Sequence, residues 1–479
     1  MPNHQDGLAT ITVGGTIFNY ACPRQTNSCI RRRIVMREPI RRDALEEAME
    51  LTRRRYPQLS LGLVKTKNSV YETHIDRPFR LGHISDTPPC IGRDTNGHMI
   101  GFWAEGNTLL VDFFHAIADD AGMDRFIQTL LYTYLTQIGQ APDNSDGRII
   151  TCDTPYDPRE GEDAGALLVA DESGKRPDVQ PRHAFKIRGL RRSVDEPEYA
   201  YTIRVGLDAF REFAKAHEAG PTAAVSVLFS SILYHHYSAC LMPSASPIIA
   251  EVAVNLRNHF PTESVRNFVG NVYLAYDASS DQSSLRGTMA SQAASLSAQN
   301  TAECQAAFYS HALALANHWF NESSLPVYAK NWVHKHIAVK AMSGGMTYGI
   351  SNIGKEQLPE CLKAHVQEYY TMVPSGLHAY LVSMRSEGDA LTLCVTSKLH
   401  DSGTVVAKLV QTLQDYGVAA RILRTEDFHY ARYVQNLAVS PAHESRVNLS
   451  PAMDKVLMGI ERISIAARDI NVAVRRKLA

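Results

Sequence analysis

The pattern of apolar positions around residue 115 predicts a buried strand, a polar turn and an amphipathic helix. The strand is indicated by a short run of apolar side chains, Leu109, Leu110, Val111 and Phe113. The helix is indicated by apolar side chains at the spacing of one buried helical face, Met123, Phe126, Ile127, Leu130, Leu131 and Tyr134. His115 therefore lies in the turn between them, where a rigid scaffold can present a side chain to a site.

Strand and helix patterns alternate in both halves of the chain. The first half predicts strands near 33–36, 61–65 and 70–75, and a helix from Asp43 to before Pro57 with Asp43 and Glu46 as a capping box. The second half predicts strands at 199–205, 248–256 and 346–351, a hairpin of 379–385 with 390–397, and helices at 208–218, 222–241, 281–299, 302–320, 327–341 and 405–416. Between them, residues 139–198 are rich in Pro, Gly and Asp, which is typical of a linker.

These elements predict an α/β (α+β) protein of two lobes, each a mixed sheet flanked by helices. The expected division is a first lobe over 1–140, a crossover linker over 141–198, a second lobe over 199–425 and a helical C-terminal extension over 426–479. In that extension, the apolar spacing over 454–478 indicates an amphipathic helix. Such a helix packs on the protein's own body, mediates self-association or binds a partner.

Composition and charge narrow the class of protein. Lys and Arg number 49 and Asp and Glu 50, so the net charge of −1 does not favour nucleic acid or an anionic membrane. The arginine triplets at 31–33 and 53–55 form local basic patches, the second on a mostly solvated helix face. The 8 cysteines include no C-x-x-C pair and no spacing suited to a metal, so we expect reduced thiols and no metal site. Because no signal peptide or membrane-length apolar stretch is evident, we expect a cytoplasmic protein with no membrane span.

His115 and Asp119, four residues apart, form the first candidate site. An imidazole titrates near neutral pH and can act as a general base, and a carboxylate can anchor the turn that carries it. The spacing equally fits a histidine bonded within a turn, with Asp119 or Asp120 as the helix N-cap. Because the chain contains 19 histidines, this spacing can arise by chance, and other motifs are needed to decide between the two interpretations.

Three motifs follow one another at the ends of predicted strands and helices. They are Phe114-His115-Ala-Ile-Ala-Asp119-Asp120; Asn255-Leu256-Arg257, with Phe260-Pro261 and Arg266-Asn267-Phe268; and Ser351-Asn352-Ile353-Gly354. In this order they resemble motifs of the CoA-dependent acyltransferase superfamily, which includes chloramphenicol acetyltransferase, the BAHD acyltransferases and condensation domains. The resemblance is strongest to the alcohol acetyltransferase-like branch and covers most of 15–420. It implies two chloramphenicol-acetyltransferase-like lobes with an active-site tunnel between them.

The resemblance also implies a role for each motif. His115 is the expected general base, which takes the proton of the acceptor directly, without an acyl-enzyme. Asp119 is expected to form a structural ion pair with Arg257 at the active site. Ser351 and Asn352 are expected to contact the oxyanion or the pantetheine arm of the donor, although both also fit simple turn chemistry.

Asp120 departs from the superfamily motif, which has glycine at this position. Glycine gives backbone freedom and leaves room beside the base, whereas aspartate adds bulk and charge. On one interpretation Asp120 raises the pKa of His115 by favouring the imidazolium. On the other, Asp120 points outward as the helix N-cap while Asp119 turns inward. Asp120 is therefore a candidate modulator of the activity.

The expected function is acyl transfer from acetyl-CoA or another acyl-CoA to an alcohol or amine of a small molecule, in secondary metabolism. The acyl-CoA is a co-substrate, and neither a tightly bound cofactor nor a nucleic acid is expected. One alternative is a condensation-type enzyme that acts on an acyl chain bound to an acyl carrier protein. Another is a catalytically silent acyltransferase-like scaffold. The scaffold would show no turnover that depends on His115, whereas the condensation-type enzyme would show such turnover without release of CoA.

Overall fold

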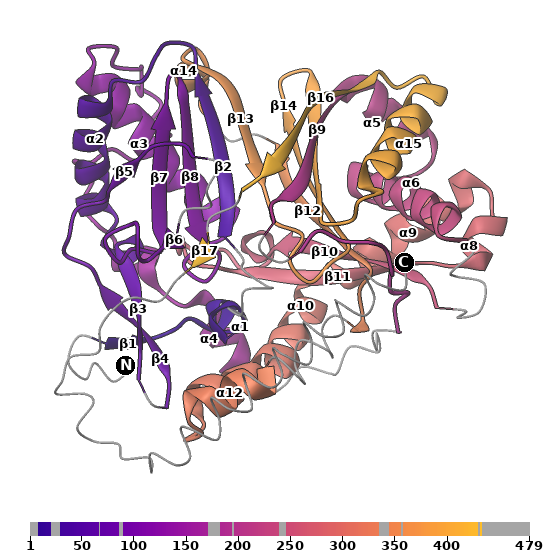
Figure 1. Ribbon diagram of the computed structural model, residues 1–479, viewed down its shortest axis with the longest axis horizontal. Coiled ribbons are helices and arrows are strands. Elements are labelled where there is room, and N and C mark those ends of the chain that lie inside the picture. The colour runs from indigo at the N-terminus through magenta and orange to yellow at the C-terminus, as the bar shows by residue number, and fades with distance from the viewer. Residues whose placement is uncertain are drawn as a thin grey trace.

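The computed structural model describes residues 8–20, 29–66, 68–85, 90–170, 183–193, 196–238, 246–334, 344–355, 358–429 and 432–433. These residues form two lobes that lie side by side, with the indigo and purple strands in one and most of the orange and yellow strands in the other (Figure 1). Each lobe is a sheet flanked by helices. The predicted two-lobed α/β architecture is confirmed.

The first lobe is built on a five-stranded sheet in the order β13-β2-β8-β7-β5. Its strands are β2 (Cys29–Met36), β5 (Leu81–Gly82), β7 (Ile100–Glu105), β8 (Thr108–Phe114) and β13 (Val366–Met372). The edge strand β13 lies antiparallel to β2, with Tyr369 opposite Ile34. Because β13 comes from the second half of the chain, the first sheet is not built from one continuous stretch of sequence.

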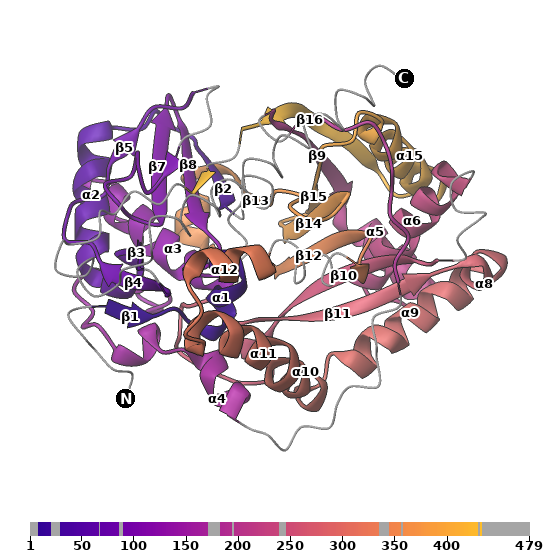
Figure 2. The same cartoon turned by 60° about the horizontal axis from the view of Figure 1, so that its bottom comes forward.

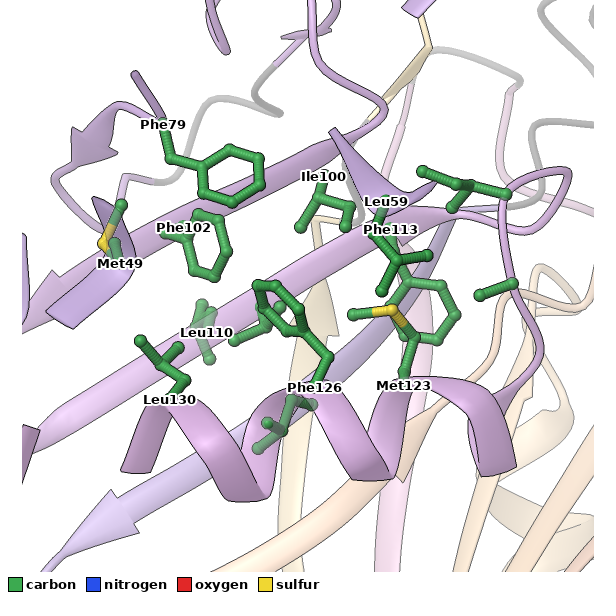
Figure 3. Close-up of a cluster of buried hydrophobic side chains, with 14 of the residues drawn as sticks. Met49, Leu59, Phe79, Ile100, Phe102, Leu110, Phe113, Met123, Phe126 and Leu130 are labelled. Carbon is green, nitrogen blue, oxygen red and sulfur yellow. The ribbon is translucent and has the colours of Figure 1, made fainter. Parts of the chain in front are cut away.

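Helices α2 (Arg42–Arg55) and α3 (Asp120–Gln137) cover one face of this sheet (Figure 1). Met123, Phe126 and Leu130 of α3 point toward the strand residues of the first lobe (Figure 3). The six apolar positions at helical spacing predicted for this helix are all buried. Burial of such a face, rather than helix propensity, supplies most of the stability of a helix in a protein.

The second lobe is built on a seven-stranded sheet in the order β11-β10-β12-β14-β15-β9-β16. Its strands are β9 (Glu198–Gly206), β10 (Ile248–Asn255), β11 (Val269–Tyr276), β12 (Tyr348–Lys355), β14 (Tyr380–Glu387), β15 (Ala390–Ser397) and β16 (Ala420–Phe428). The β10–β12 and β12–β14 pairs are parallel, and the other pairs are antiparallel. Its outer face packs on α5 (Leu207–Ala216), α6 (Pro221–His236) and α15 (Ser402–Asp415).

The inner face of the second sheet is turned toward the first lobe. Ser383 of β14 donates a hydrogen bond from Oγ to the carbonyl oxygen of Thr371 on β13, at 2.8 Å. Arg385, two residues along the same strand, reaches the N-terminal turn of α3. Since alternate residues of a strand share one face, the inner face carries Ser383 and Arg385 together.

Further helices lie along one side of the two lobes and come forward in Figure 2. They are α1 (Val13–Tyr20), α4 (Ala164–Ala170), α8 (Ala278–Gln282), α9 (Leu285–Gln299), α10 (Ala302–Phe308), α11 (Ala314–Asn317) and α12 (Val327–Val333). A second small sheet has the order β1-β4-β3, from β1 (Leu8–Thr10), β3 (Leu61–Lys65) and β4 (Val70–His74). Helix α14 (Glu360–Lys363) precedes β13, and β6 (Cys90–Ile91) pairs with β17 (Arg432–Tyr433). In the described ranges, no helix combines the length and apolar character needed to cross a membrane.

Some local expectations differ from the structure. Helix α2 begins after Arg41, whose side chain makes no capping bond, so the capping box of Asp43 and Glu46 is wrong. The segment expected as a linker contains α4, and its Asp163 accepts a hydrogen bond from the backbone N of Val13 at 2.7 Å. Strand β16 continues to Phe428 and so crosses the expected start of the extension at 426. The helix expected over 454–478 lies outside the described residues.

The arginine triplets are largely ion-paired rather than free basic patches. Arg31 forms a bidentate pair with Asp112, with nitrogen–oxygen distances of 2.7 and 2.8 Å. Arg55, expected on a solvated face, is buried and forms a bidentate pair with Glu160. Paired arginines of this kind fix neighbouring elements to one another and leave little free charge for a phosphate.

Candidate active site

His115 lies in a tight, buried turn between β8 and α3. The three residues that follow it, Ala116, Ile117 and Ala118, are buried. Asp119 is the N-cap of α3, because its Oδ1 accepts a hydrogen bond from the backbone N of Gly122 at 2.8 Å. This bond satisfies one of the backbone donors that the first turn of a helix leaves unpaired. The cap therefore fixes the backbone just beyond His115.

The imidazole of His115 has a defined orientation. Its Nδ1 lies 3.2 Å from the carbonyl oxygen of Ala118. Nδ2 of Asn267 also lies 3.4 Å from Nδ1, but its two hydrogens serve the nearer carbonyl oxygens of His115 and Gly14. Because a carbonyl oxygen can only accept, the contact with Ala118 assigns the hydrogen of the neutral ring to Nδ1 and the lone pair to Nε2. Burial lowers the pKa of His115, and the charge of Asp119 and, more weakly, that of Asp120 oppose this shift. The half-buried ring is therefore a neutral imidazole at neutral pH, with Nε2 as its basic atom.

Helix α1 covers one side of the His115 ring. The ring of Phe18 stacks on the imidazole, with 4.3 Å between ring centroids and 20° between ring planes. The helix can lie this close because a Cβ atom at Gly15 would be only 2.6 Å from the carbonyl oxygen of Ala116. A Cβ atom at Gly14 would be 2.4 Å from the carbonyl oxygen of Asn267. Two glycines without side chains thus permit the contact that shields His115 from water.

Asn267, from the connection that leads into β11, binds the same turn from the second lobe. Its Nδ2 donates to the carbonyl oxygen of His115 at 3.0 Å and to that of Gly14 at 3.2 Å. One side chain therefore joins α1, the His115 turn and the second lobe.

Asp119 and Arg257 form a buried ion pair between the lobes. Nη1 of Arg257 lies 2.7 Å from Oδ2 of Asp119, and their side chains are 13% and 4% exposed. The same oxygen accepts from the backbone N of Phe268 at 2.8 Å. Arg257 also donates to the carbonyl oxygens of Ser264 and Arg266, so both partners of the pair have several hydrogen bonds. The pair that the resemblance implied is thus present and holds the second lobe against the His115 turn.

Asp120 is the first residue of α3 and is not its N-cap. Its carboxylate accepts from Arg32 at 2.5 Å and from Oγ1 of Thr371 at 2.9 Å, and it lies 3.3 Å from Arg385. Neither expected interpretation describes it fully. The cap is Asp119, and burial outweighs the effect of Asp120 on the pKa of His115.

Ser351 and Asn352, in the middle of β12, point to opposite faces of the second sheet. Ser351 is opposite Ser383 in the β12–β14 pairing, so it shares the inner face with Arg385. Asn352 donates from Nδ2 to Oγ1 of Thr222 on α6 at 2.7 Å, and its Oδ1 accepts from the backbone N of Gly354 at 2.9 Å. Asn352 thus fixes the irregularity of β12 before Gly354, whereas Ser351 is half-buried and faces the first lobe.

Sequence spacing gives no signal for two residues of this site, Phe18 and Arg385. Both reach the His115 turn from segments distant in sequence. The Gly14-Gly15 pair beside an apolar stretch is a signal that could have indicated close backbone packing. In the residues that the structure describes, no group of three or more His, Cys, Asp or Glu side chains could hold a metal ion.

Solved structures similar to this chain include fungal trichothecene-acting proteins, a polyketide synthase associated protein and a condensation domain. F. graminearum TRI101, solved with coenzyme A and deoxynivalenol, has a TM-score of 0.56 at 12% identity over 86% of this chain and 99% of its own. Polyketide synthase associated protein 5 of Mycobacterium tuberculosis has a TM-score of 0.56 at 14% identity, over 85% and 98%. The first condensation domain of the CDA synthetase has a TM-score of 0.51 at 12% identity, over 86% and 96%.

These similarities span almost the whole length of each of the three proteins. No protein-family model matches the chain, and no curated protein sequence matches it. The likeness is therefore one of three-dimensional structure, and it extends over 85–86% of this chain and so over both lobes. The chain therefore has the two-lobed fold of TRI101, polyketide synthase associated protein 5 and the condensation domain of the CDA synthetase.

Proposed function

We propose that this protein transfers an acyl group from an acyl-CoA to a hydroxyl or amine group of a small molecule, with His115 as the general base. The orientation of the imidazole carries the proposal. Nδ1 faces the carbonyl oxygen of Ala118, which leaves Nε2 as the proton acceptor, and burial lowers the pKa of His115 so that the ring stays neutral. A neutral imidazole is the form that a general base requires.

In the proposed reaction, Nε2 of His115 takes the proton of the acceptor as its oxygen or nitrogen attacks the thioester carbonyl carbon. The carbon–sulfur bond then breaks, and the imidazolium returns the proton to the departing thiolate of CoA. The Asp119 carboxylate favours the transient imidazolium by its charge. Arg257 acts through Asp119 and holds the turn, so that the base stays aligned with both substrates.

Ser351 is the proposed contact for the oxyanion or for the pantetheine arm of the donor. Its position on the inner face of the second sheet, opposite Ser383, supports this role. A hydroxyl donor aimed at the developing oxyanion stabilises the transition state of acyl transfer. Asn352 is left out of this role because its amide oxygen and nitrogen already bind Gly354 and Thr222.

The structural neighbours support the choice of substrates. TRI101 was solved with coenzyme A and deoxynivalenol, and TRI3 of Fusarium sporotrichioides is a trichothecene 15-O-acetyltransferase. A CoA thioester as donor and a small organic molecule as acceptor therefore suit a protein of this fold. We propose such an acceptor here without assigning its skeleton.

The proposal is tested by measuring thiol release from acetyl-CoA and longer acyl-CoAs with a panel of alcohols and amines. Wild type, His115→Ala and the control His318→Ala are compared, because the His318 side chain is 68% exposed and its ion pair among the described residues is with the exposed Glu322. We expect acceptor-dependent CoA release that is lost in His115→Ala and kept in His318→Ala. Full activity in His115→Ala, or no release by wild type with any pair, would overturn the proposal. Consumption of acyl-phosphopantetheine thioesters, but of no acyl-CoA, would also overturn the proposed donor and would favour an acyl chain bound to a carrier protein.

A further inference from the structure

Behind the His115 turn, two carboxylates and two guanidinium groups form a compact buried cluster. Asp120 and Asp124 lie one turn apart on α3, and both face Arg32 of β2, at 2.5 and 2.9 Å. Residues four apart on a helix share one face, which is why a single arginine can reach both. This cluster is separate from the Asp119–Arg257 pair, which holds the opposite side of the same turn.

The second lobe completes the cluster. Nη2 of Arg385 on β14 lies 2.7 Å from Asp124 and 3.3 Å from Asp120. The crossover strand β13 contributes Thr371, which donates to Asp120 at 2.9 Å, and Tyr369, which donates to Asp124 at 2.7 Å. The cluster therefore joins α3 and β2 to a strand of the other lobe and to the strand that crosses between the lobes.

The cluster is buried and its charges balance. The side chains of Arg32, Arg385, Asp124 and Asp120 are 0%, 3%, 7% and 14% exposed. Both guanidinium groups lie over the ring of Tyr369, at 4.5 and 5.0 Å from its centroid. Burial raises the pKa of Asp124, but the charges of Arg32 and Arg385 outweigh burial and hold it below its ordinary value. Removing one member of such a cluster leaves an uncompensated charge in a poorly solvated site.

We propose that Asp120, Asp124, Arg32 and Arg385 are positioning residues that clamp β14 and β13 onto the first turn of α3 and neutralise the charge of Asp120 beside His115. The clamp makes an aspartate tolerable where the superfamily motif has glycine. The clamp rests on the proposed function only because that function takes His115 as the general base.

The direction in which each substitution shifts the pKa of His115 follows from the charged groups around the imidazole. Asp119 lies on one side and is paired with Arg257. Asp120 lies on the other side and is paired with Arg32 and Arg385. Among the described residues, helix α1 contributes only the uncharged ring of Phe18 to these surroundings. Loss of Asp120 leaves the two arginines with only Asp124, and the excess positive charge disfavours the imidazolium. Loss of Arg385 leaves Asp120 poorly neutralised, and the excess negative charge favours the imidazolium. A purely structural role predicts one direction for both variants, since looser packing admits water to the ring in each.

The test is an NMR titration of the His115 ring in histidine-labelled full-length protein, assigned by the signal missing in His115→Ala. Asp120→Asn is expected to move the titration midpoint to lower pH, and Arg385→Met to move it to higher pH. Both variants lose stability in chemical denaturation. The double variant Asp120→Asn/Arg385→Met keeps one aspartate, Asp124, and one arginine, Arg32, so its titration midpoint is expected to return toward that of wild type. Its loss in free energy of unfolding is expected to be smaller than the sum of the losses of the two single variants. Glu160→Gln, which breaks the buried pair with Arg55 away from this cluster, is the control and leaves the midpoint unchanged.

Shifts of both single variants in the same direction, or additive losses in the double variant, would overturn the clamp. If Asp120→Asn or Arg385→Met does not fold, the double variant and Arg385→Lys still decide the matter. The clamp requires the double variant and Arg385→Lys to fold, and the His115 midpoint of each to lie near that of wild type. Failure of either of these two variants to fold would contradict the clamp. Because the titration needs no turnover, a protein without acyltransferase activity would refute the proposed function while leaving the clamp open to this test.

Discussion

Asp119 and Asp120 are adjacent in the chain, yet their carboxylates pair with arginines from two separate strand ends of the second lobe. Asp119 binds Arg257, just beyond β10, and Asp120 lies against Arg385, near the end of β14. The first turn of α3 is thus held on two sides by the opposite lobe. His115 lies immediately before this turn, so the position of its ring depends on contacts between the lobes.

Arg257→Ala is expected to reduce the free energy of unfolding by about 3 kcal/mol, because it leaves the buried Asp119 carboxylate without its cation. The turnover number should fall by about 100-fold, as the base loses its alignment. Arg257→Lys should recover part of both losses, since it keeps the charge but not the fixed set of bonds to Ser264 and Arg266. Urea denaturation and steady-state kinetics measure the two effects. Arg286→Ala, which removes an exposed pair with Glu218, is the control, and an equal effect there would contradict this prediction.

Phe18→Ala is expected to raise the pKa of His115, because water then reaches the imidazole that Phe18 covers and burial is the main cause of the lowered pKa. A general base must be unprotonated, so the acidic limb of the kcat/KM profile should move to higher pH. Phe18→Leu, which keeps an apolar cover, should move it less. A limb that stays in place in Phe18→Ala would mean that the stacked ring does not control access of water.

Gly122→Ala is expected to lower the free energy of unfolding by about 1–3 kcal/mol, although alanine is the better helix former. A Cβ atom at this position would lie 2.0 Å from the carbonyl oxygen of Val265, so α3 must shift away from the second lobe. Gly287→Ala is the matched control, because Gly287 is likewise the third residue of its helix, α9, and its new Cβ would lie 3.2 Å from the Oγ of the N-cap Ser284. Thermal or urea denaturation compares the two variants. An equal change in the free energy of unfolding in both would contradict the prediction, because it would mean that α3 and Val265 can move apart at little cost.

Stability is expected to fall as the pH drops from about 6.5 to about 4, because of two buried histidines. Burial lowers the pKa of His98 and of His334 from 6.5 to about 4. In this interval the unfolded chain binds protons that the folded protein does not, so the free energy of unfolding decreases with falling pH. Each histidine contributes at most about 3 kcal/mol to this loss.

His334→Leu should reduce the slope of stability against pH in this interval. Neither ring nitrogen of His334 has a hydrogen-bond partner among the described residues, so leucine removes proton uptake without breaking a bond to any of them. Urea denaturation at several pH values measures the slope. The exposed His318→Leu is the control and should leave it unchanged. An unchanged slope in His334→Leu would contradict the prediction, because it would mean that His334 binds protons as readily in the folded protein as in the unfolded chain.

Local patterns predicted individual elements well. The strand expected at 61–65 is β3, and the one expected at 390–397 is β15, with the same limits. The buried face of α3 was also predicted, because burial on one side of an element leaves a periodic trace in neighbouring residues. The turn that carries His115 followed directly from these two kinds of pattern.

The remaining features depend on contacts between residues far apart in sequence. Apolar periodicity marks a residue as buried but does not say which strand lies beside it, so β13 was not assigned to the first sheet. Arg385 and Phe18 belong to the site only through tertiary packing. The arginine triplets looked like basic patches for the same reason, since the carboxylates that pair with Arg31 and Arg55 come from other elements.

The crossover of β13 has a consequence for how the protein is made. The ribosome delivers β2, β8 and α3 early, but the strand that covers the edge of β2 is complete only when residue 372 has been translated. Until then the nascent first lobe exposes an open strand edge, which can pair with other chains. The first lobe therefore completes its sheet only after most of the second lobe has been synthesised. A chain split for co-expression would keep the first lobe whole only if both pieces are present while it folds.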